Sequence, residues 1–141
     1  MFSQTSPQSQ STSNRKLHVL LVEDEPVQLE IYRQKLASWE ILMDVISADN
    51  GINALLKLGQ TPPDIVITDL NMPLMDGFQM LRMMFQSIRS QKSHFIVITG
   101  LPLDEVRQQG SLPVDVTLMG KPVDFDKLEK TVRDKVDELS I

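Results

Sequence analysis

The sequence predicts a three-layer α/β fold in which five βα units build a doubly wound, five-stranded parallel sheet. Two observations predict it. From Leu17 onward, short apolar runs alternate five times with segments whose apolar residues recur every three or four positions. Turn-forming residues such as Pro26, Asn50-Gly51 and Gly120 separate these segments. Parallel strands need crossover connections, which are right-handed and place helices on both faces of the sheet.

Five apolar runs are predicted as strands, at residues 17–22, about 41–47, 64–68, 95–99 and 116–119. The third run, DIVIT, is suited to a strand buried on both faces.

Five helices are predicted by their apolar stripes: Leu29, Tyr32, Leu36 and Trp39; Ile52, Leu55 and Leu56; Phe78, Leu81, Phe85 and Ile88; a short segment at 103–109; and Phe125, Leu128, Val132, Val136 and Leu139. Met80 and Met83 are predicted to lie off the stripe of the third helix.

Composition bounds the class of protein. The 141 residues fit one domain, and the absence of cysteine excludes disulfides, thiolate catalysis and Cys-based zinc sites. A net charge of -5 disfavours binding to nucleic-acid phosphates, and no apolar run approaches a membrane span. No signal-peptide pattern begins the chain, so we expect a cytoplasmic protein. Residues 1–15, rich in Ser and Gln, are predicted as a disordered tail before a domain at 16–141.

Polar residues follow four of the five predicted strands. Glu23 and Asp24 follow the first, Asp69 the third, Thr99 ends the fourth and Lys121 follows the fifth. Ligands of parallel sheets bind beyond the carboxyl ends of the strands. We therefore expect three acids, a hydroxyl and an ammonium to converge at one edge.

This set predicts a magnesium-dependent phosphoryl-transfer site. Carboxylates brought together repel one another, and a hard cation such as Mg²⁺ removes the conflict. Glu23 and Asp24 are interpreted as metal anchors, and Asp69 as both ligand and nucleophile. Lys121 and the Thr99 hydroxyl could contact phosphoryl oxygens, and Gly100 has no side chain to crowd them.

Taken singly, each residue has an ordinary structural explanation. Glu23 or Asp24 could cap the next helix, and Asp69 could form an Asx-turn. Thr99 could be a strand residue and Lys121 a solvated surface lysine. Their joint position at the strand ends favours a site.

With these residues in place, the sequence resembles the receiver domains of response regulators, the CheY-like family of two-component signalling. The matching pieces are LLVEDEP, DIVITDLNMPLMDG, FIVITG and LMGKP, within residues 16–139. The second piece is the most specific, with Asp69 after an apolar strand and Met72-Pro73 and Met75-Asp76-Gly77 after it. The resemblance implies a flavodoxin-like sheet in the strand order 2-1-3-4-5.

The resemblance also implies roles for individual residues. Asp69 would be the phosphoacceptor, Asp24 a direct Mg²⁺ ligand and Glu23 a second acid that acts through water. The backbone carbonyl of Asn71 would be a third protein ligand.

Thr99 would be the switch hydroxyl and Lys121 the lysine of the family site. The phosphodonor would be a histidine kinase, a phosphotransfer protein or a small acyl phosphate. Phosphorylation would then shift the population of two loop arrangements and alter contacts with a downstream partner or output domain, without turnover of a second substrate.

Two features depart from the family pattern. Leu118 stands where many members have an aromatic residue that moves with the threonine. Pro102, Gly110 and Pro113 predict a short fourth helix followed by a long loop.

Two rival functions stay open. A phosphatase of the haloacid dehalogenase type also uses a nucleophilic Asp, but it needs a second Asp two residues later, where this chain has Asn71. A degenerate receiver that acts only as a binding module is the other rival. Whether the chain stands alone or belongs to a longer protein also stays open.

Overall fold

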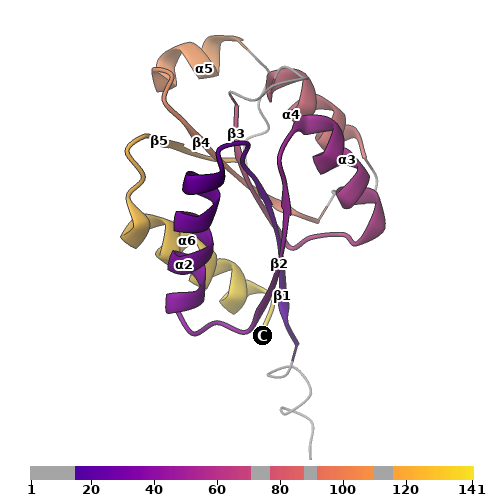
Figure 1. The fold of residues 1–141 in the computed structure, drawn as a ribbon, viewed down its shortest axis with the longest axis vertical. Helices are drawn as coiled ribbons and strands as arrows, with labels where there is room; N and C mark the ends of the chain where they lie inside the picture. Colours follow the sequence, from indigo (N-terminus) through magenta and orange to yellow (C-terminus); the bar gives the residue numbers. More distant parts are fainter. Residues whose placement is uncertain (1–14, 71–76, 88–91, 110–115) are drawn as a thin grey trace, which may run out of the picture.

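The structure is a computed structural model and describes residues 15–70, 77–87, 92–109 and 116–141 (Figure 1). Residues 1–14 of the predicted tail therefore lie outside the described residues. Arg15, the last residue of that predicted tail, pairs with Asp64 at 2.8 Å. Over the described ranges, no helix is both long and apolar enough to cross a bilayer.

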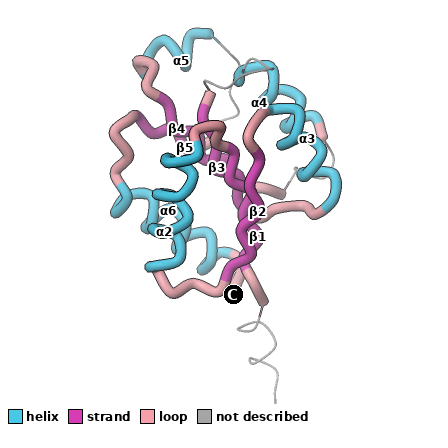
Figure 2. The backbone as a smooth tube through the Cα atoms, in the orientation of Figure 1, coloured by secondary structure: helices cyan, strands magenta, loops and turns pink. Residues whose placement is uncertain are grey.

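The strands form one parallel sheet in the order β2-β1-β3-β4-β5 (Figure 2). Their bounds are Leu17–Val22 for β1, Met43–Ala48 for β2, Ile65–Asp69 for β3, His94–Thr99 for β4 and Thr117–Gly120 for β5. All five residues of β3 are buried, which agrees with the burial predicted for residues 65–68 of the run DIVIT. Asp64, the first residue of that run, lies before the strand, and Asp69 extends the strand by one residue. The predicted fold class and strand order are confirmed.

The second strand begins two residues later than predicted. The register pairs Leu17, the first residue of β1, with Met43, so Ile41 and Leu42 lie before the ladder. Leu42 is exposed, and its carbonyl accepts a hydrogen bond from Leu17 N–H.

The helices are α2 (Pro26–Ser38), α3 (Gly51–Gln60), α4 (Gly77–Gln86), α5 (Leu103–Gln109) and α6 (Phe125–Glu138). Three begin at a side chain that accepts a backbone hydrogen bond from the first turn: Glu25 for α2, Asn50 for α3 and Asp124 for α6. The cap of α2 is thus Glu25, and capping does not explain Glu23 or Asp24.

Helices cover both faces of the sheet (Figure 1). The helices α2 and α6 pack on one face and enclose the α2/α6 cluster, whose buried members are Leu17, Val19, Leu21, Tyr32, Leu36, Trp39, Ile65, Ile67, Ile96, Ile98, Met119, Leu128 and Val132. The helices α3, α4 and α5 pack on the other face over the alternate strand residues, among them Leu20, Val66 and Val97.

The buried face of α4 differs from the predicted one. Its fully buried side chains are Met80, Leu81 and Met84. The prediction that Met80 lies off the stripe is wrong, because an unbranched thioether fills the gaps against the sheet. Met83 is exposed, which agrees with its predicted place off the stripe, and Ile88 lies outside the described residues.

The helix α5 has seven residues, which confirms the short fourth helix. The long loop predicted after it, at residues 110–115, lies outside the described residues.

Candidate functional site at the carboxyl edge of the sheet

The register of β1 and β3 brings two acids together. Val22 ends β1 and pairs with Thr68 of β3, so Glu23, the residue after β1, lies beside Asp69, the last residue of β3. Glu23 is 3% exposed and Asp69 is 7% exposed. Burial of two carboxylates is unfavourable unless positive charge or hydrogen bonds compensate it. Asp24, next in the chain, is exposed.

Lys121 is the cation of this edge. It follows β5, and its Nζ lies 2.6 Å from Asp69 Oδ2, across the 52 residues that separate them in sequence. The backbone holds it there, since Lys121 N–H donates to the carbonyl of Thr99 at 2.9 Å. The lysine side chain is 34% exposed and that of Asp69 is 8% exposed, so the lysine is the solvent-facing member of the pair.

The pKa of Glu23 indicates a carboxylate whose negative charge is only partly compensated by its surroundings. Burial raises the pKa of Glu23 above its ordinary value. The hydrogen bond from Glu25 N–H and the charge of Lys121 oppose that rise, whereas the charges of Asp69 and Asp24 add to it. These couplings place all four charged groups within electrostatic reach of one another.

Lys121 has the opposite balance. Burial, the largest single effect, lowers its pKa, but the hydrogen bond and negative charge of Asp69, together with the charges of Glu23 and Asp24, outweigh burial. The pKa of Lys121 therefore lies above its ordinary value, and the ammonium stays charged.

Thr99 ends β4, next to both Asp69 and Lys121. It pairs with Gly120 in the sheet and is 1% exposed. Its hydroxyl accepts a hydrogen bond from Leu101 N–H at 3.1 Å, which ties it to the loop that leads into α5. A Cβ at Gly100 would meet no protein atom within 4 Å, so the space beside this residue is open.

The structure thus brings Glu23, Asp24, Asp69, Thr99 and Lys121 to one edge. Asn71, the predicted source of a metal-binding carbonyl, lies outside the described residues.

The described side chains have the chemistry that a magnesium ion requires, but by themselves they do not complete its coordination shell. Within the described ranges, no three His, Cys, Asp or Glu side chains are grouped closely enough to hold a metal by themselves. Mg²⁺ does not require such a group, because it binds through one or two carboxylates and keeps several waters. A buried acid with a raised pKa, Glu23, beside Asp69 and the exposed Asp24 supplies hard oxygen ligands that lack full charge compensation.

Tyr32 and Glu25 were missed as members of this environment. Tyr32 was predicted as a core residue and is buried, but burial and then the charges of Glu23 and Asp69 raise its pKa. A hydroxyl-bearing residue within an apolar stripe, two turns after the acids, was the signal available in the sequence. Glu25 differs from its neighbours by capping α2, which only the backbone geometry reveals.

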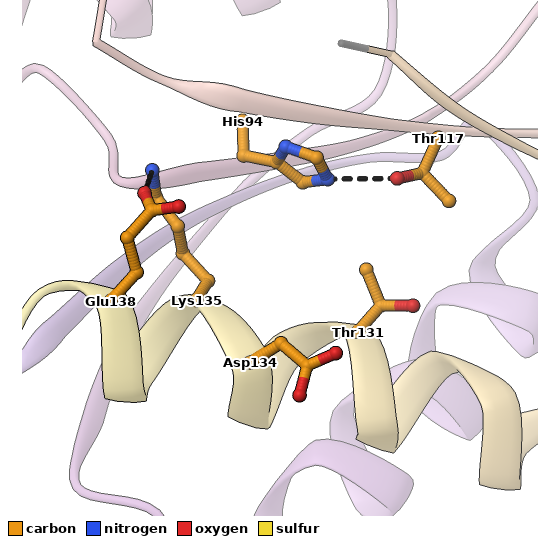
Figure 3. A pocket seen from close by; sticks show the side chains of 6 residues that line it. All are labelled: His94, Thr117, Thr131, Asp134, Lys135 and Glu138. Carbon is orange, nitrogen blue, oxygen red and sulfur yellow. Dashed lines mark hydrogen bonds and ion pairs between the residues drawn. The ribbon is translucent and has the colours of Figure 1, made fainter.

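A pocket of about 260 Å³ lies at the opposite, amino edge of the sheet (Figure 3). It is lined by His94, Thr117, Thr131, Asp134, Lys135 and Glu138. Two pairs form within it: His94 Nε2 lies 2.8 Å from Thr117 Oγ1, and Lys135 Nζ lies 2.7 Å from Glu138 Oε2. Thr131 and Asp134 instead pair along α6, with the carbonyl of Lys127 and with Lys130. None of the predicted site residues lines this pocket.

Comparisons with known proteins agree with the fold. Residues 19–133 match the family described as the response regulator receiver domain. The chain is 32% identical over 134 residues to the transcriptional regulatory protein GlrR of Escherichia coli (strain K12), covering 89% of this chain and 28% of GlrR. It is 30% identical over 122 residues to the sensor histidine kinase RcsC of Salmonella typhi, covering 85% of this chain and 12% of RcsC.

The chain therefore spans a minor part of the length of these two relatives. Among solved structures, the chemotaxis response regulator CheY4 of Vibrio cholerae has a TM-score of 0.74 at 24% identity, over 86% of this chain and 99% of CheY4. That likeness concerns the fold, and the family match covers most of the chain. On these grounds the chain belongs to the response regulator receiver domain family of two-component systems.

Proposed function

We propose that this receiver is a phosphorylation-dependent switch that accepts a phosphoryl group on Asp69. One observation carries the proposal: a nearly buried acid at the end of a central strand lies 2.6 Å from the ammonium of Lys121, which a different strand presents. A stabilising surface ion pair would not need this burial or the second buried acid, Glu23, beside it.

The proposed reaction moves one phosphoryl group. A carboxylate oxygen of Asp69 forms a bond to phosphorus, and the bond from phosphorus to the donor nitrogen or oxygen breaks with its electron pair leaving on the donor. The Lys121 ammonium offsets charge on the transferred oxygens. The buried Thr99 hydroxyl, which accepts from Leu101, still has its own O–H to donate to a phosphoryl oxygen.

Mg²⁺ is the cofactor that we propose for this site. Asp24 and Asp69 would bind it directly, Glu23 would act through water, and the carbonyl of Asn71 would be a further ligand. When bound, the ion would offset the negative charge of the acids and of the phosphoryl oxygens.

The output would be a change in protein contacts. Moving the Thr99 hydroxyl toward a phosphoryl group would break its hydrogen bond with Leu101 N–H and release the start of the loop before α5. Two loop arrangements would then differ in population, which is sufficient for signalling. Leu118 stands at the usual aromatic position and is partly buried. The part of this switch that would respond to phosphorylation is therefore the loop between Thr99 and α5.

The donor that we propose is a histidine kinase or phosphotransfer protein in the cytoplasm, and the recipient of the signal is a protein partner or an output domain. The switch modifies itself and turns over no second substrate. We further propose that residues 16–141 form the receiver and that residues 1–15 are a tail.

The test is incubation with a small acyl phosphate, with and without Mg²⁺, followed by intact-mass measurement. We expect one phosphoryl group per chain, dependent on Mg²⁺ and absent in Asp69→Asn. Glu40→Gln, at an exposed turn, is the matched control and should be modified like the unchanged chain. A full mass shift in Asp69→Asn would refute Asp69 as the acceptor.

The rivals predict other outcomes of the same assay. Repeated turnover of a phosphomonoester would favour the phosphatase. Absence of any mass shift under excess donor would favour a receiver that only binds partners.

A further inference from the structure

An aromatic contact joins the two helices that follow the site loops. The helix α2 begins just after Glu23 and Asp24, and α6 begins just after Lys121. The ring of Tyr32 on α2 meets the ring of Phe125, the first residue of α6, edge-on with centroids 6.0 Å apart and planes at 67°. Such a geometry is favourable for aromatic pairs.

The contact is anchored from both sides. Tyr32 is 2% exposed and belongs to the α2/α6 cluster, against which Phe125 also packs. The ammonium of Lys35, one turn further along α2, lies 5.3 Å from the centre of the Phe125 ring. Phe125 is therefore held by two residues of α2, with one aromatic and one cation–π contact.

Tyr32 also points toward the site. Side chains of a helix lean toward its N-terminus, and the N-terminus of α2 lies at the carboxyl edge of the sheet. The Tyr32 hydroxyl hydrogen-bonds with Gln28, one turn closer to that edge, and burial together with the charges of Glu23 and Asp69 raises the pKa of the phenol. The phenol thus stays neutral beneath the acids.

We propose that Tyr32 is a positioning residue of the phosphoryl-transfer site, which through its ring contact with Phe125 fixes the separation between the acids of the first loop and Lys121. The sequence between Lys121 and Phe125 is only Pro122, Val123 and Asp124, of which Val123 packs on the same cluster and Asp124 caps α6. A displacement of Phe125 is therefore transmitted to Lys121 through a short, anchored segment. The inference rests on the proposed function.

The experiment is a double-mutant cycle on the rate of phosphorylation by a small acyl phosphate, at saturating donor and Mg²⁺. We expect Tyr32→Leu and Phe125→Leu each to slow the reaction about tenfold, which is less than the roughly hundredfold loss that a 1 Å misplacement of a reacting group can cause. The double variant should be no slower than either single one, because both changes remove the same contact. Tyr32→Phe keeps the ring and should keep the rate.

Leu36→Ala is the matched control. Leu36 is 1% exposed, lies on the same helix and in the same cluster, and is one turn further from the site. It should lose stability without losing rate, whereas a merely structural role for Tyr32 would make the two variants alike. All rates are measured at a temperature at which circular dichroism shows each variant folded.

A second measurement does not depend on phosphorylation. In the unmodified protein, Tyr32→Leu should shift the amide NMR signals of Lys121 and Val123, and Leu36→Ala should leave them in place. Unshifted signals, or rates within twofold of the unchanged chain, would overturn the positioning role. If the unchanged chain takes no phosphoryl group while the signals do shift, the proposed function fails, and only the structural coupling between Tyr32 and the segment at Lys121 stands.

Discussion

The two edges of the parallel sheet handle charge in opposite ways. At the carboxyl edge, Glu23 and Asp69 are nearly buried side by side, and Lys121 is the lysine that pairs with Asp69. At the amino edge, charged side chains form local pairs near solvent, such as Arg15 with Asp64 and Lys135 with Glu138. The pairs of the amino edge satisfy their own members, whereas the acids of the carboxyl edge outnumber their cation.

This contrast separates function from stability. Exposed pairs contribute little free energy, but their charges cost little to keep in water. Buried like charges cost free energy in the resting protein, and they persist where a ligand or a reaction compensates them. The carboxyl edge is therefore where removal of a side chain should alter chemistry, and the amino edge is where it should leave chemistry unchanged.

The largest expected effect is on Lys121. Lys121→Met removes the ammonium that lies 2.6 Å from Asp69, and we expect phosphorylation by an acyl phosphate to slow about 100-fold, as losing one preorganised electrostatic contact does. The rate is measured by intact mass over time.

Lys135→Met is the matched control for that change. Lys135 is also a partly buried lysine that pairs with an acid, but it lies at the amino edge in the pocket of Figure 3. Its replacement should leave the rate unchanged. A rate for Lys121→Met within threefold of the unchanged chain would show that the contrast between the edges has no catalytic meaning.

Two helical glycines sharpen the comparison at the level of stability. A Cβ at Gly77, at the start of α4, would collide with the backbone of Leu70, the residue after Asp69. A Cβ at Gly59, near the end of α3, would meet nothing within 4 Å. We expect Gly77→Ala to cost about 1–3 kcal/mol through overpacking, and Gly59→Ala to gain up to about 1 kcal/mol through helix propensity.

Urea denaturation of both alanine variants measures these differences. The comparison fails if Gly77→Ala has the same free energy of unfolding as the unchanged chain, because the backbone at Leu70 would then move aside without loss of stability.

Most of the fold could be predicted because periodicity follows directly from burial. The alternation of apolar runs predicted the layers, and the run DIVIT predicted the buried strand β3. Which residues of α4 face inward could not be predicted, because phenylalanine and methionine carry similar hydrophobic signals and the packing decides between them. Met80 became a core residue, while Phe85 is partly buried and meets Phe95 edge-on.

The candidate site could be predicted for the residues that lie at the ends of predicted strands. Glu23, Asp69 and Lys121 follow apolar runs, and parallel strands end at one edge. The role of Tyr32 was not predictable, because its contact with Phe125 spans 93 residues and depends on how α2 and α6 pack. The strand order itself came from resemblance, since local patterns do not encode which strands are neighbours.

The smallest expected effect concerns two glutamates at opposite edges. The folded-state pKa of Glu23 is raised, chiefly by burial, so ionised Glu23 costs stability. The contribution of protonated Glu23 to folding stability is fully present below the unfolded pKa near 4.5, and it is lost as the pH rises through the higher folded pKa. Without Mg²⁺ at pH 7, Glu23→Gln should therefore raise Tm by roughly 4 °C, which corresponds to about 1 kcal/mol in a domain of this size.

Glu138 at the amino edge should show the opposite sign. A hydrogen bond from Lys135 lowers the pKa of Glu138. The contribution of ionised Glu138 to folding stability is therefore present above the unfolded pKa and is lost as the pH falls through the lower folded pKa. Glu138→Gln should lower Tm slightly at pH 7, because solvent screens an exposed pair. Thermal melts of both variants between about pH 4 and pH 8 measure the two signs, and equal signs at pH 7 would mean that the edges do not differ in how they hold charge.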